Sequence, residues 1–426
     1  MKKNVLVFPC GSEIGLEIHR SLRYSAHFRL FGGSSVEDHG RFVYDEYIGE
    51  IPFHYAPDFI EVMARIVRKF HIDAIYPAMD TVSVTLKSNQ QALGCYVIGS
   101  SASANAVCAS KKKTYQALAG KVDIPAWSDS LDTAPGYPLF IKPDVGYGAR
   151  NVLLAKNRES AESFVSSRGG ESKFLYCENL SGDEFTVDCF SDRYGELLFV
   201  GGRKRERISN GISVCTKPAS VHVQAFQAVA RRINDVIRPR GAWFFQMKED
   251  RNGRPKLLEV AARLGGSSSL FRGLGVNFAL LSVFDGFGLP VMVEPNQYDI
   301  ELDRALSNSY RLGIEYSKVY VDYDDCILLK EGVNVEIMRF LFSALREKKK
   351  LILISRHDGD LMASLVENRI HAVFDEVIHL EMGTPKSRHI DPEGAIFIDD
   401  SYVERSEVKR VHGIPVFSPD MIEMLL

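Results

Sequence analysis

The sequence predicts a multidomain protein of α/β and α+β units, and three observations support this fold class. First, its 426 residues exceed the roughly 100–200 residues of one ordinary domain. Second, short apolar runs alternate with amphipathic stretches near both ends of the chain, a rhythm typical of parallel, doubly wound sheets. Third, the middle holds strand-like runs separated by glycine and charged turns, which predict antiparallel hairpins with interspersed helices. We expect units at 1–100, 101–310 and 316–426, with the last junction at Ser307–Glu315.

Composition and charge indicate a globular protein that acts on small molecules. Hydrophobic residues make up 45% and charged residues 25% of the chain, which excludes disordered and fibrous classes. The 52 Lys and Arg against 55 Asp and Glu give a net charge of −3, so we expect neither a nucleic-acid nor a membrane-surface partner. No apolar run approaches the ~18 residues of a membrane span. Seven scattered cysteines without CxxC spacing favour reduced thiols, and we expect a cytoplasmic location.

The first unit begins with a strand, a glycine turn and a helix. Residues 4–9 (NVLVFP) form the apolar run, and the turn Gly11–Gly15 (GSEIG) precedes the amphipathic stretch LEIHRSLR. Such an opening also occurs in dinucleotide-binding folds. The spacing here is GxxxG rather than GxGxxG, and no acidic residue ends the second predicted strand in the way a ribose site requires, so the pattern argues against NAD.

The middle unit contains a candidate phosphate-binding loop. Lys142 ends a predicted strand in IKPDVGYGARN and is followed by Gly146 and Gly148. Glycines let backbone N–H groups approach phosphate oxygens, while a lysine on the adjoining strand neutralises charge. Taken alone, such a segment is more often an ordinary hairpin.

Acidic and amide side chains follow at strand positions. Glu178 and Glu184 lie in FLYCENLSGDEFTVD, where their carboxylates can accept hydrogen bonds from a nucleotide. Gln246 and Glu259 fall on two adjacent predicted strands, and Arg263 comes shortly after. An amide oxygen and a carboxylate are hard ligands of the kind that Mg²⁺ prefers.

In this order, the segments around Lys111 (SKKKTYQAL), Lys142, Glu178 to Glu184 and Glu259 (LLEVAARLGGSS) resemble the ATP-grasp superfamily. The resemblance is to the carboxylate–amine ligases with a carbamoyl-phosphate-synthetase-like grasp, and residues 1–100 resemble their N-terminal domain. It implies a site with the following roles: Lys111, Lys142 and the loop of Gly146 and Gly148 at the ATP phosphates, Glu178 at the adenine-side hinge, Glu184 at the ribose, and Glu259 with Gln246 at Mg²⁺.

The same resemblance implies the chemistry of a ligase that uses ATP and Mg²⁺. A substrate carboxylate attacks the γ-phosphate to give an acyl phosphate and ADP, and an amine then displaces phosphate. Arg263, with the serines at 267–269, would hold the acidic substrate or the transferring phosphoryl group. Ala261 stands where the family usually has an asparagine, so one expected oxygen ligand is missing. The basic run RKRER (203–207) either presents positive charge to this site or is a solvated strand end.

The last unit contains a second candidate site. Asp322 and Asp324 end the strand-like run KVYVDYDD, and side chains two apart on an extended chain point the same way. One can serve as nucleophile and the other as general acid/base, although a lone DxD is also common in solvated turns. Further polar residues follow in order, most of them at the ends of apolar runs: Ser355, Lys386, Asp399 and Asp400.

Together these residues resemble the haloacid dehalogenase (HAD) superfamily of aspartyl-phosphate phosphotransferases, with its Rossmann-like fold. The resemblance implies that Asp322 attacks phosphorus and Asp324 protonates the leaving group. Ser355 and Lys386 would hold phosphoryl oxygens, and Asp399 or Asp400 would bind Mg²⁺ together with Asp322. The unit has no room for a large cap insertion, which leaves such a site open.

We therefore expect an ATP-dependent ligase that joins a carboxylic acid to an amine, fused to a phosphatase that acts on a phosphorylated metabolite in the same pathway. Family analogy adds a homodimer. One alternative is a HAD phosphohydrolase regulated by a nucleotide-binding module of weak catalytic power. A second alternative is a non-enzymatic scaffold in which both sites are inactive.

Overall fold

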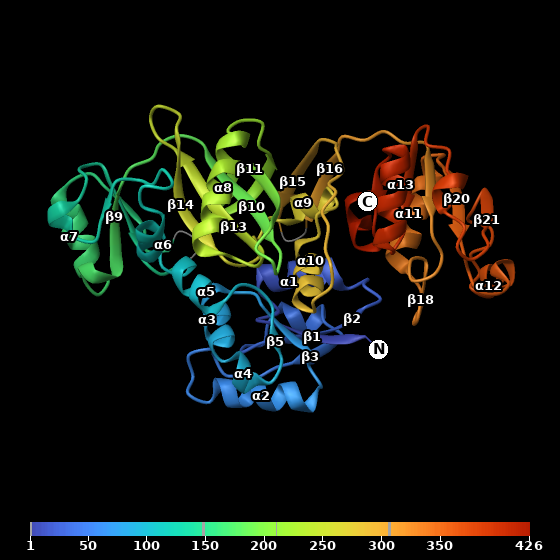
Figure 1. Ribbon diagram of the computed structural model, residues 1–426, viewed down its shortest axis with the longest axis horizontal. Helices are drawn as coiled ribbons and strands as arrows, with labels where there is room; N and C mark the ends of the chain where they lie inside the picture. The colour runs from blue at the N-terminus through green and yellow to red at the C-terminus, as the bar shows by residue number, and fades with distance from the viewer. Residues whose placement is uncertain (1, 147–149, 210, 306–307) are drawn as a thin grey trace.

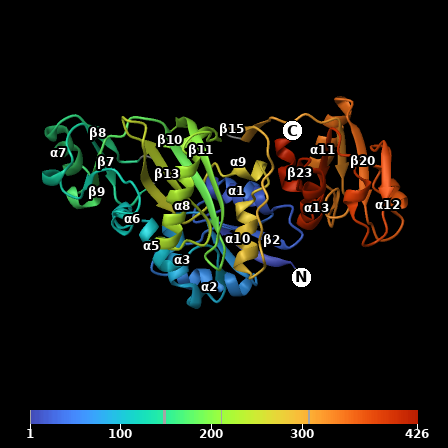
Figure 2. The ribbon, with the colours of Figure 1, turned by 45° about the horizontal axis from the view of Figure 1, so that its top comes forward.

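The computed structural model describes residues 2–146, 150–209, 211–305 and 308–426 (Figure 1). Within these ranges it contains four sheets of four or more strands and a separate two-stranded hairpin. A small antiparallel sheet and the C-terminal sheet lie at opposite ends of the molecule, with the seven-stranded sheet between them and the N-terminal unit below it (Figures 1 and 2).

The N-terminal unit is a parallel sheet of order β3-β2-β1-β4-β5. Its strands are β1 (Lys3–Phe8), β2 (Phe28–Gly33), β3 (Glu46–Ile48), β4 (Ala74–Pro77) and β5 (Tyr96–Val97). Its helices are α1 (Glu13–Leu22), α2 (Phe59–Lys69), α3 (Asp80–Ser88) and α4 (Gln90–Leu93). The strand order reverses between β1 and β4, so the predicted doubly wound sheet is confirmed.

The GSEIG turn begins helix α1. The hydroxyl of Ser12 accepts a hydrogen bond from Gly15 N at 3.0 Å and so caps the helix. A Cβ atom on Gly15 would lie 2.5 Å from the carbonyl oxygens of Pro9 and Cys10, so glycine is required for the helix to pack this closely on the turn. The second glycine of the motif therefore serves packing.

The two faces of the N-terminal sheet are covered by different parts of the chain. Leu6 and Phe8 pack with α2 and α3 of the same unit. Val5 and Val7 on the other face share a core with Val283 of α10 (Phe278–Gly286), which comes from the middle unit. Figures 1 and 2 both show α10 beside α1. The N-terminal and middle units therefore form one continuous hydrophobic core.

The middle unit starts with α5 (Ala102–Cys108) and α6 (Lys111–Leu118) and continues into an antiparallel sheet of order β6-β9-β7-β8. The bounds are β6 (Trp127–Ser128), β7 (Leu139–Pro143), β8 (Leu153–Ala155), α7 (Arg158–Ser166) and β9 (Phe174–Glu178). The predicted antiparallel hairpins are confirmed here.

A seven-stranded antiparallel sheet of order β14-β13-β10-β11-β12-β15-β16 forms the rest of this unit. Its elements are β10 (Glu184–Ser191), β11 (Leu197–Ser209), β12 (Ile212–Pro218), α8 (Val223–Ile237), β13 (Gly241–Glu249), β14 (Pro255–Ala261), α9 (Ser269–Gly273), α10, β15 (Ile300–Arg304) and β16 (Asn308–Leu312). Phe185, Val187 and Phe245 alternate along their strands and pack in one core with residues of α8. The residues between them face the other way, so this sheet has one apolar and one polar face.

Strand β16 lies where we expected the junction between the middle and C-terminal units. It covers residues 308–312 and pairs with β15, so most of the segment Ser307–Glu315 belongs to the seven-stranded sheet. The sheet ends at Leu312, two residues beyond the expected limit at 310.

The C-terminal unit is a second parallel sheet, of order β21-β20-β17-β22-β23. Its elements are β17 (Lys318–Val321), the hairpin β18 (Leu328–Leu329) and β19 (Gly332–Val333), α11 (Val335–Arg346), β20 (Lys350–Ser355), α12 (Leu361–Glu367), β21 (Glu376–His379), β22 (Ala395–Ile398), α13 (Tyr402–His412) and β23 (Val416–Phe417). The strand order reverses between β17 and β22, and the chain leaves both strands at the same edge. The expected α/β unit is confirmed.

The end of the C-terminal unit, the 3-10 helix η5 (Pro419–Met424), packs on the rest of the molecule through Arg272 of α9. The Arg272 side chain is 2% exposed and donates to Glu17 of α1 at 2.8 Å, to the carbonyl of Asp420 at 2.8 Å and to Glu423 at 2.7 Å. We call these four residues the Arg272 network. It joins all three units through buried charges.

No helix within the described ranges is both long enough and apolar enough to cross a bilayer.

Candidate functional site

The polar face of the seven-stranded sheet holds the predicted metal ligands. Gln246 of β13 and Glu259 of β14 stand directly opposite each other in the antiparallel register. Both side chains leave the face opposite to α8. The prediction that these two residues lie on neighbouring strands is confirmed, and their oxygens can approach one ion.

Lys111 reaches this pair from the first turn of α6. Its Nζ lies 3.4 Å from Glu259 Oε2 and 3.2 Å from the carbonyl of Gly146. Ser110 caps the helix by accepting from Lys113 N at 3.1 Å, which fixes where Lys111 starts. The structure thus brings Lys111, Gly146 and Glu259 together. Gly148, the other glycine of the predicted loop, lies outside the described residues.

Lys142 of β7 approaches the same place from the small sheet. Its side chain is buried, and Nζ donates to Tyr115 Oη at 2.7 Å and to the carbonyl of Leu258 at 3.1 Å. Leu258 immediately precedes Glu259 in β14. Lys111 therefore contacts the Glu259 carboxylate itself, and Lys142 contacts the main chain of the preceding residue from a different element.

These cations change the titration of Glu259. Burial alone would raise its pKa, but Lys111, Lys142 and Arg263 outweigh burial and lower the pKa below its ordinary value. A carboxylate that stays ionised among three cations suits a site for a polyanion with a divalent metal.

The carboxylates of Glu178 and Glu184 are engaged by basic side chains. Glu178, at the end of β9, accepts from Ala126 N at 3.1 Å and pairs with Lys256. Glu184, at the start of β10, pairs with Arg205. Arg205 also donates to Gln246 Oε1 at 3.1 Å, so it links Glu184 to the metal-ligand pair.

The basic residues of the run 203–207 are divided between the two faces of strand β11. Arg203 and Arg205 are buried on the polar face and pair with Asp188 and Glu184. Lys204 and Arg207 point away and pair with Asp183 and Asp303 on the surface. Sequence reasoning did not single out Arg205, although the period of two along a strand indicates it.

Arg263 lies at the border between the middle and N-terminal units. Its Nε donates to Asp80 Oδ2 at 2.7 Å, and its guanidinium lies 5.2 Å from the ring centre of Phe244. Asp80 is the first residue of α3, at the carboxyl edge of the N-terminal sheet. In the serine run, Ser267 donates to the carbonyl of Ser213 and accepts from Arg304. Arg263 therefore faces the N-terminal unit.

A second cluster forms at the carboxyl edge of the C-terminal sheet. Lys386 Nζ lies 2.7 Å from Asp322 Oδ1 and 2.6 Å from Asp399 Oδ2. Ser355 ends β20 beside β17, and its side chain is fully buried. Residues from four separate segments of sequence thus meet at one edge, as the sequence predicts for a doubly wound sheet.

The acidic residues of this cluster fit a divalent cation. Asp322, Asp399 and Asp400 each offer a carboxylate oxygen, and these oxygens lie within 4.8 Å of one another. Burial and the neighbouring Asp322 raise the pKa of Asp399 to about 7, and the same causes raise that of Asp400 to about 6. Lys386 offsets only part of this repulsion, so the hard-oxygen set favours an ion such as Mg²⁺.

Asp324 has a different partner from Asp322. Its two carboxylate oxygens lie 2.8 and 3.0 Å from Nδ1 of His357. Sequence reasoning missed His357, which follows Ser355 by two residues just past the end of β20. Its position at the carboxyl edge of a parallel strand is the signal that indicates it.

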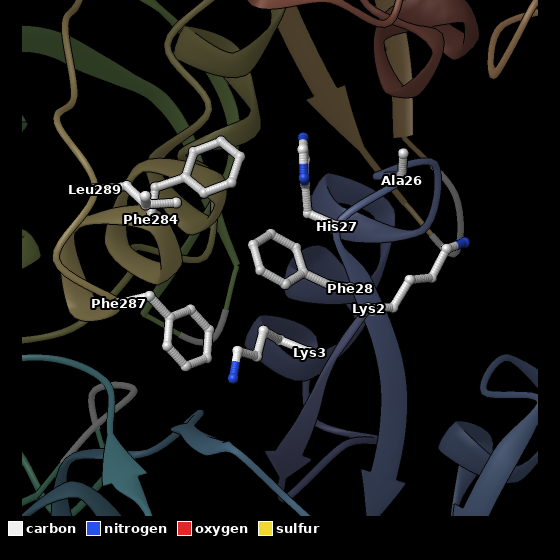
Figure 3. Close-up of a pocket in the computed structure, with 8 residues that line it drawn as sticks. All are labelled: Lys2, Lys3, Ala26, His27, Phe28, Phe284, Phe287 and Leu289. Atoms are coloured by element: carbon white, nitrogen blue, oxygen red, sulfur yellow. The ribbon is translucent and has the colours of Figure 1, made fainter.

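A pocket of about 530 Å³ lies elsewhere, between the first residues of β1 and β2 and helix α10 (Figure 3). Phe28, Phe284 and Phe287 line it, and His27 meets Phe284 edge-on at 5.4 Å (Figure 3). This is the amino edge of the N-terminal sheet, away from the edge at which Asp80 meets Arg263. None of the predicted site residues lines it.

Comparisons with known proteins agree with this geometry. Residues 171–303 match a family model described as "ATP-grasp in the biosynthetic pathway with Ter operon". The structure is similar to biotin carboxylase from Campylobacter jejuni, with a TM-score of 0.59 and 16% identity over 71% of this chain and 76% of that one. A comparison with curated protein sequences found no match.

Two further solved structures share the fold, each over 71% of this chain. For N5-carboxyaminoimidazole synthetase from Staphylococcus aureus the TM-score is 0.58 at 16% identity, with 83% of that chain covered. For L-amino acid ligase from Bacillus licheniformis it is 0.56 at 17% identity, with 79% covered. The chain therefore contains an ATP-grasp fold.

Proposed function

We propose that the first two units form an ATP-dependent ligase that joins a carboxylic acid to an amine and releases ADP and phosphate. The observation that supports this most directly is that Lys111 contacts Glu259, opposite Gln246, while Lys142 contacts the carbonyl of the adjacent Leu258. The Campylobacter structure is described as a complex with a β-γ-ATP ligand, and the Staphylococcus enzyme also as a complex with ADP. A carboxylase domain from Hydrogenobacter thermophilus is described with MgADP. On this basis we assign ATP and Mg²⁺ to this chain.

In this proposal each residue of the candidate site has one task. Lys111, Lys142 and the loop of Gly146 and Gly148 bind the phosphates. Glu178 and Glu184 accept hydrogen bonds from the adenine side and the ribose. Gln246 and Glu259 hold Mg²⁺, which neutralises phosphate charge when bound. Since Glu259 remains ionised beside Lys111, Lys142 and Arg263, the donor set fits this ion.

The acid substrate enters at the border with the N-terminal unit. Arg263 exchanges part of its contact with Asp80 for the substrate carboxylate and holds that group near the γ-phosphate. A carboxylate oxygen attacks phosphorus, the bond to ADP breaks, and an acyl phosphate forms. The amine nitrogen then attacks the acyl carbon, loses a proton and displaces inorganic phosphate.

The test is product analysis with Mg²⁺, ATP and pooled amino acids and sugar acids. We expect ADP together with a new mass equal to acid plus amine minus water. Lys142→Ala should abolish both products. Lys112→Ala is the matched control, because Lys112 is a half-exposed lysine on α6, next to Lys111, and pairs with Asp129. ADP formation that survives Lys142→Ala, or no ADP with any pool, would refute the ligase.

For the C-terminal unit, from about residue 316, we propose a Mg²⁺-dependent HAD phosphatase that acts on a phosphorylated metabolite. The supporting observation is the contact of Lys386 with both Asp322 and Asp399. Asp322 attacks phosphorus while Ser355 and Lys386 hold phosphoryl oxygens. Asp324 protonates the leaving oxygen, and water then hydrolyses the aspartyl phosphate. The carboxylates of Asp322, Asp399 and Asp400 hold the metal.

Asp322→Asn tests this second activity. We expect it to abolish phosphate release from a pool of phosphorylated metabolites, whereas Lys142→Ala leaves that release unchanged. If only phosphate release is found, and ATP binding alters it, the regulated phosphohydrolase replaces the ligase as the function of the protein. If neither activity is found and ATP does not stabilise the protein, the scaffold alternative holds.

The proposal also includes a cytoplasmic location and a homodimer. All seven cysteines are free, and six of them are buried. A set of free thiols suits a reducing compartment. The Hydrogenobacter domain is described as a dimer. Size-exclusion chromatography with light scattering tests the dimer directly.

A further inference from the structure

The carboxyl group of Asp324 is held by a single imidazole. His357 Nδ1 lies 2.8 Å from one Asp324 oxygen and 3.0 Å from the other. The Asp324 side chain is 47% exposed and that of His357 only 17%. Within the described parts of the chain, no other side chain hydrogen-bonds or pairs with this carboxylate.

The His357 ring is fixed independently of Asp324. It meets the ring of Tyr323 edge-on at 5.2 Å and 82°. Tyr323 is fully buried and its hydroxyl lies 2.7 Å from Ser364 Oγ in α12, so it is a firm support. The main-chain carbonyl of His357 accepts a hydrogen bond from His379 Nε2 of β21 at 2.9 Å. The core of the unit therefore sets the position of the imidazole, and the imidazole sets that of the carboxyl group.

We propose that His357 is a positioning residue for the C-terminal site, which holds Asp324 where it can donate its proton to the leaving group. The inference rests on the phosphatase proposed above. Because both carboxyl oxygens lie within reach of Nδ1, a bond from Nδ1–H to either one leaves the other oxygen available to the leaving group. When the phosphorus–oxygen bond breaks, Asp324 gives a proton to the leaving oxygen, and its carboxylate keeps the bond to His357. The same carboxylate later takes a proton from the water that attacks the aspartyl phosphate.

This role predicts a dependence on the leaving group that a purely structural role does not. A p-nitrophenolate leaves without help from an acid because it is weakly basic. An alkoxide requires a proton as the bond breaks. Misplacing Asp324 therefore slows an alkyl phosphate much more than an aryl phosphate, whereas a general distortion of the cluster around Asp322 and Lys386 slows both alike.

The experiment compares full-length variants on p-nitrophenyl phosphate and β-glycerol phosphate, both with Mg²⁺. We expect His357→Ala to lower kcat/KM, which reports the steps up to the aspartyl phosphate, about 10- to 100-fold for β-glycerol phosphate and less than about threefold for p-nitrophenyl phosphate. His357→Asn places an amide nitrogen close to the position of Nδ1 and should restore most of the loss. His371→Ala, at an exposed histidine of the same unit, is the control for the loss of an imidazole.

The outcomes separate this inference from the function on which it rests. Equal losses on the two esters in His357→Ala, or no loss on either, overturn the positioning role while the phosphatase stands. Failure of His357→Asn to recover more activity than His357→Ala also overturns it. A wild-type protein that hydrolyses neither ester nor any phosphorylated metabolite refutes the phosphatase and this inference together.

Discussion

The ammonium group of Lys142 lies 2.7 Å from the phenolic oxygen of Tyr115, and both side chains are buried. The Tyr115 hydroxyl in turn donates to the carbonyl of Leu258 at 2.8 Å, next to Glu259 in β14. Helix α6 therefore connects the lysine of the small sheet to the strand that bears the proposed metal ligand. The lysine that we propose to bind phosphate is thus held in place by the protein itself, and such preorganisation lowers the cost of binding.

Tyr115→Phe removes the oxygen that accepts from Lys142 and leaves a buried ammonium with one partner fewer. We expect the KM for ATP to rise about tenfold and the unfolding free energy to fall by about 1.5–3 kcal/mol, because a hydrogen bond to a charged group is lost. Steady-state ADP formation and urea denaturation measure the two effects. Tyr137→Phe is the control, since Tyr137 is 42% exposed. An unchanged KM for ATP would show that Tyr115 does not position the lysine.

Ala261→Asn restores the oxygen that the family pattern expects. Ala261 is two residues from Glu259 on β14, so its side chain leaves the same face of the sheet. We expect the Mg²⁺ concentration for half-maximal ADP formation to fall about three- to tenfold, because one more hard ligand faces the ion. Glu259→Gln should have the opposite effect. Equal Mg²⁺ titrations in Ala261→Asn and wild type would place the ion out of reach of position 261.

The sequence predicts most of the strands and helices that carry the two candidate sites, but not the contacts between distant segments. Alternating strands and helices indicate the two parallel sheets, and the carboxyl edges of those sheets then place Asp322 and Asp399 together. Gln246 and Glu259 are correctly predicted to lie on neighbouring strands, because a short turn joins those strands. These are local patterns. In open α/β sheets, residues at the carboxyl ends of neighbouring strands lie close together, so such patterns are enough to predict where a site lies.

Contacts between distant segments leave no local pattern. The bond between Arg272 and Glu17 joins residues 255 apart, and the pairing of Asp324 with His357 joins residues 33 apart. Strand β16 was missed because its residues are mostly polar and become a strand only by pairing with β15. Arg205 was hidden in a charged run, where burial alternates from one residue to the next.

His19 in α1 should make the protein sensitive to acid. Burial, with Arg23 and Arg20 nearby, lowers its pKa from 6.5 to about 4, so the folded protein keeps this imidazole neutral. The unfolded chain binds the proton at a higher pH, and stability therefore falls as pH drops from about 6.5 to 4. The loss reaches at most about 3 kcal/mol at the lower limit.

His19→Asn removes this titration, and we expect a flatter dependence of the melting temperature on pH between 4 and 6.5. Melting curves at half-unit pH steps measure it. His371→Asn, at an exposed position, serves as the control. Parallel curves for His19→Asn and wild type would rule out His19 as the cause of acid sensitivity.

Arg272→Leu leaves the carboxylates of Glu17 and Glu423 close together without their shared cation. We expect the unfolding free energy to fall by about 3–5 kcal/mol, as is typical when one partner of a buried ion pair is removed. Urea denaturation followed by fluorescence measures it, with Arg231→Leu on the exposed side of α8 as the control. A loss as small as that of the control would mean that water replaces the guanidinium without cost.

The Arg272 network also sets an order of events during translation. Glu17 leaves the ribosome before Arg272, and Asp420 and Glu423 emerge after both. Until then the guanidinium lacks two of its acceptors. The N-terminal unit, although made before the C-terminal unit, therefore completes this contact only when residues 420–423 are present.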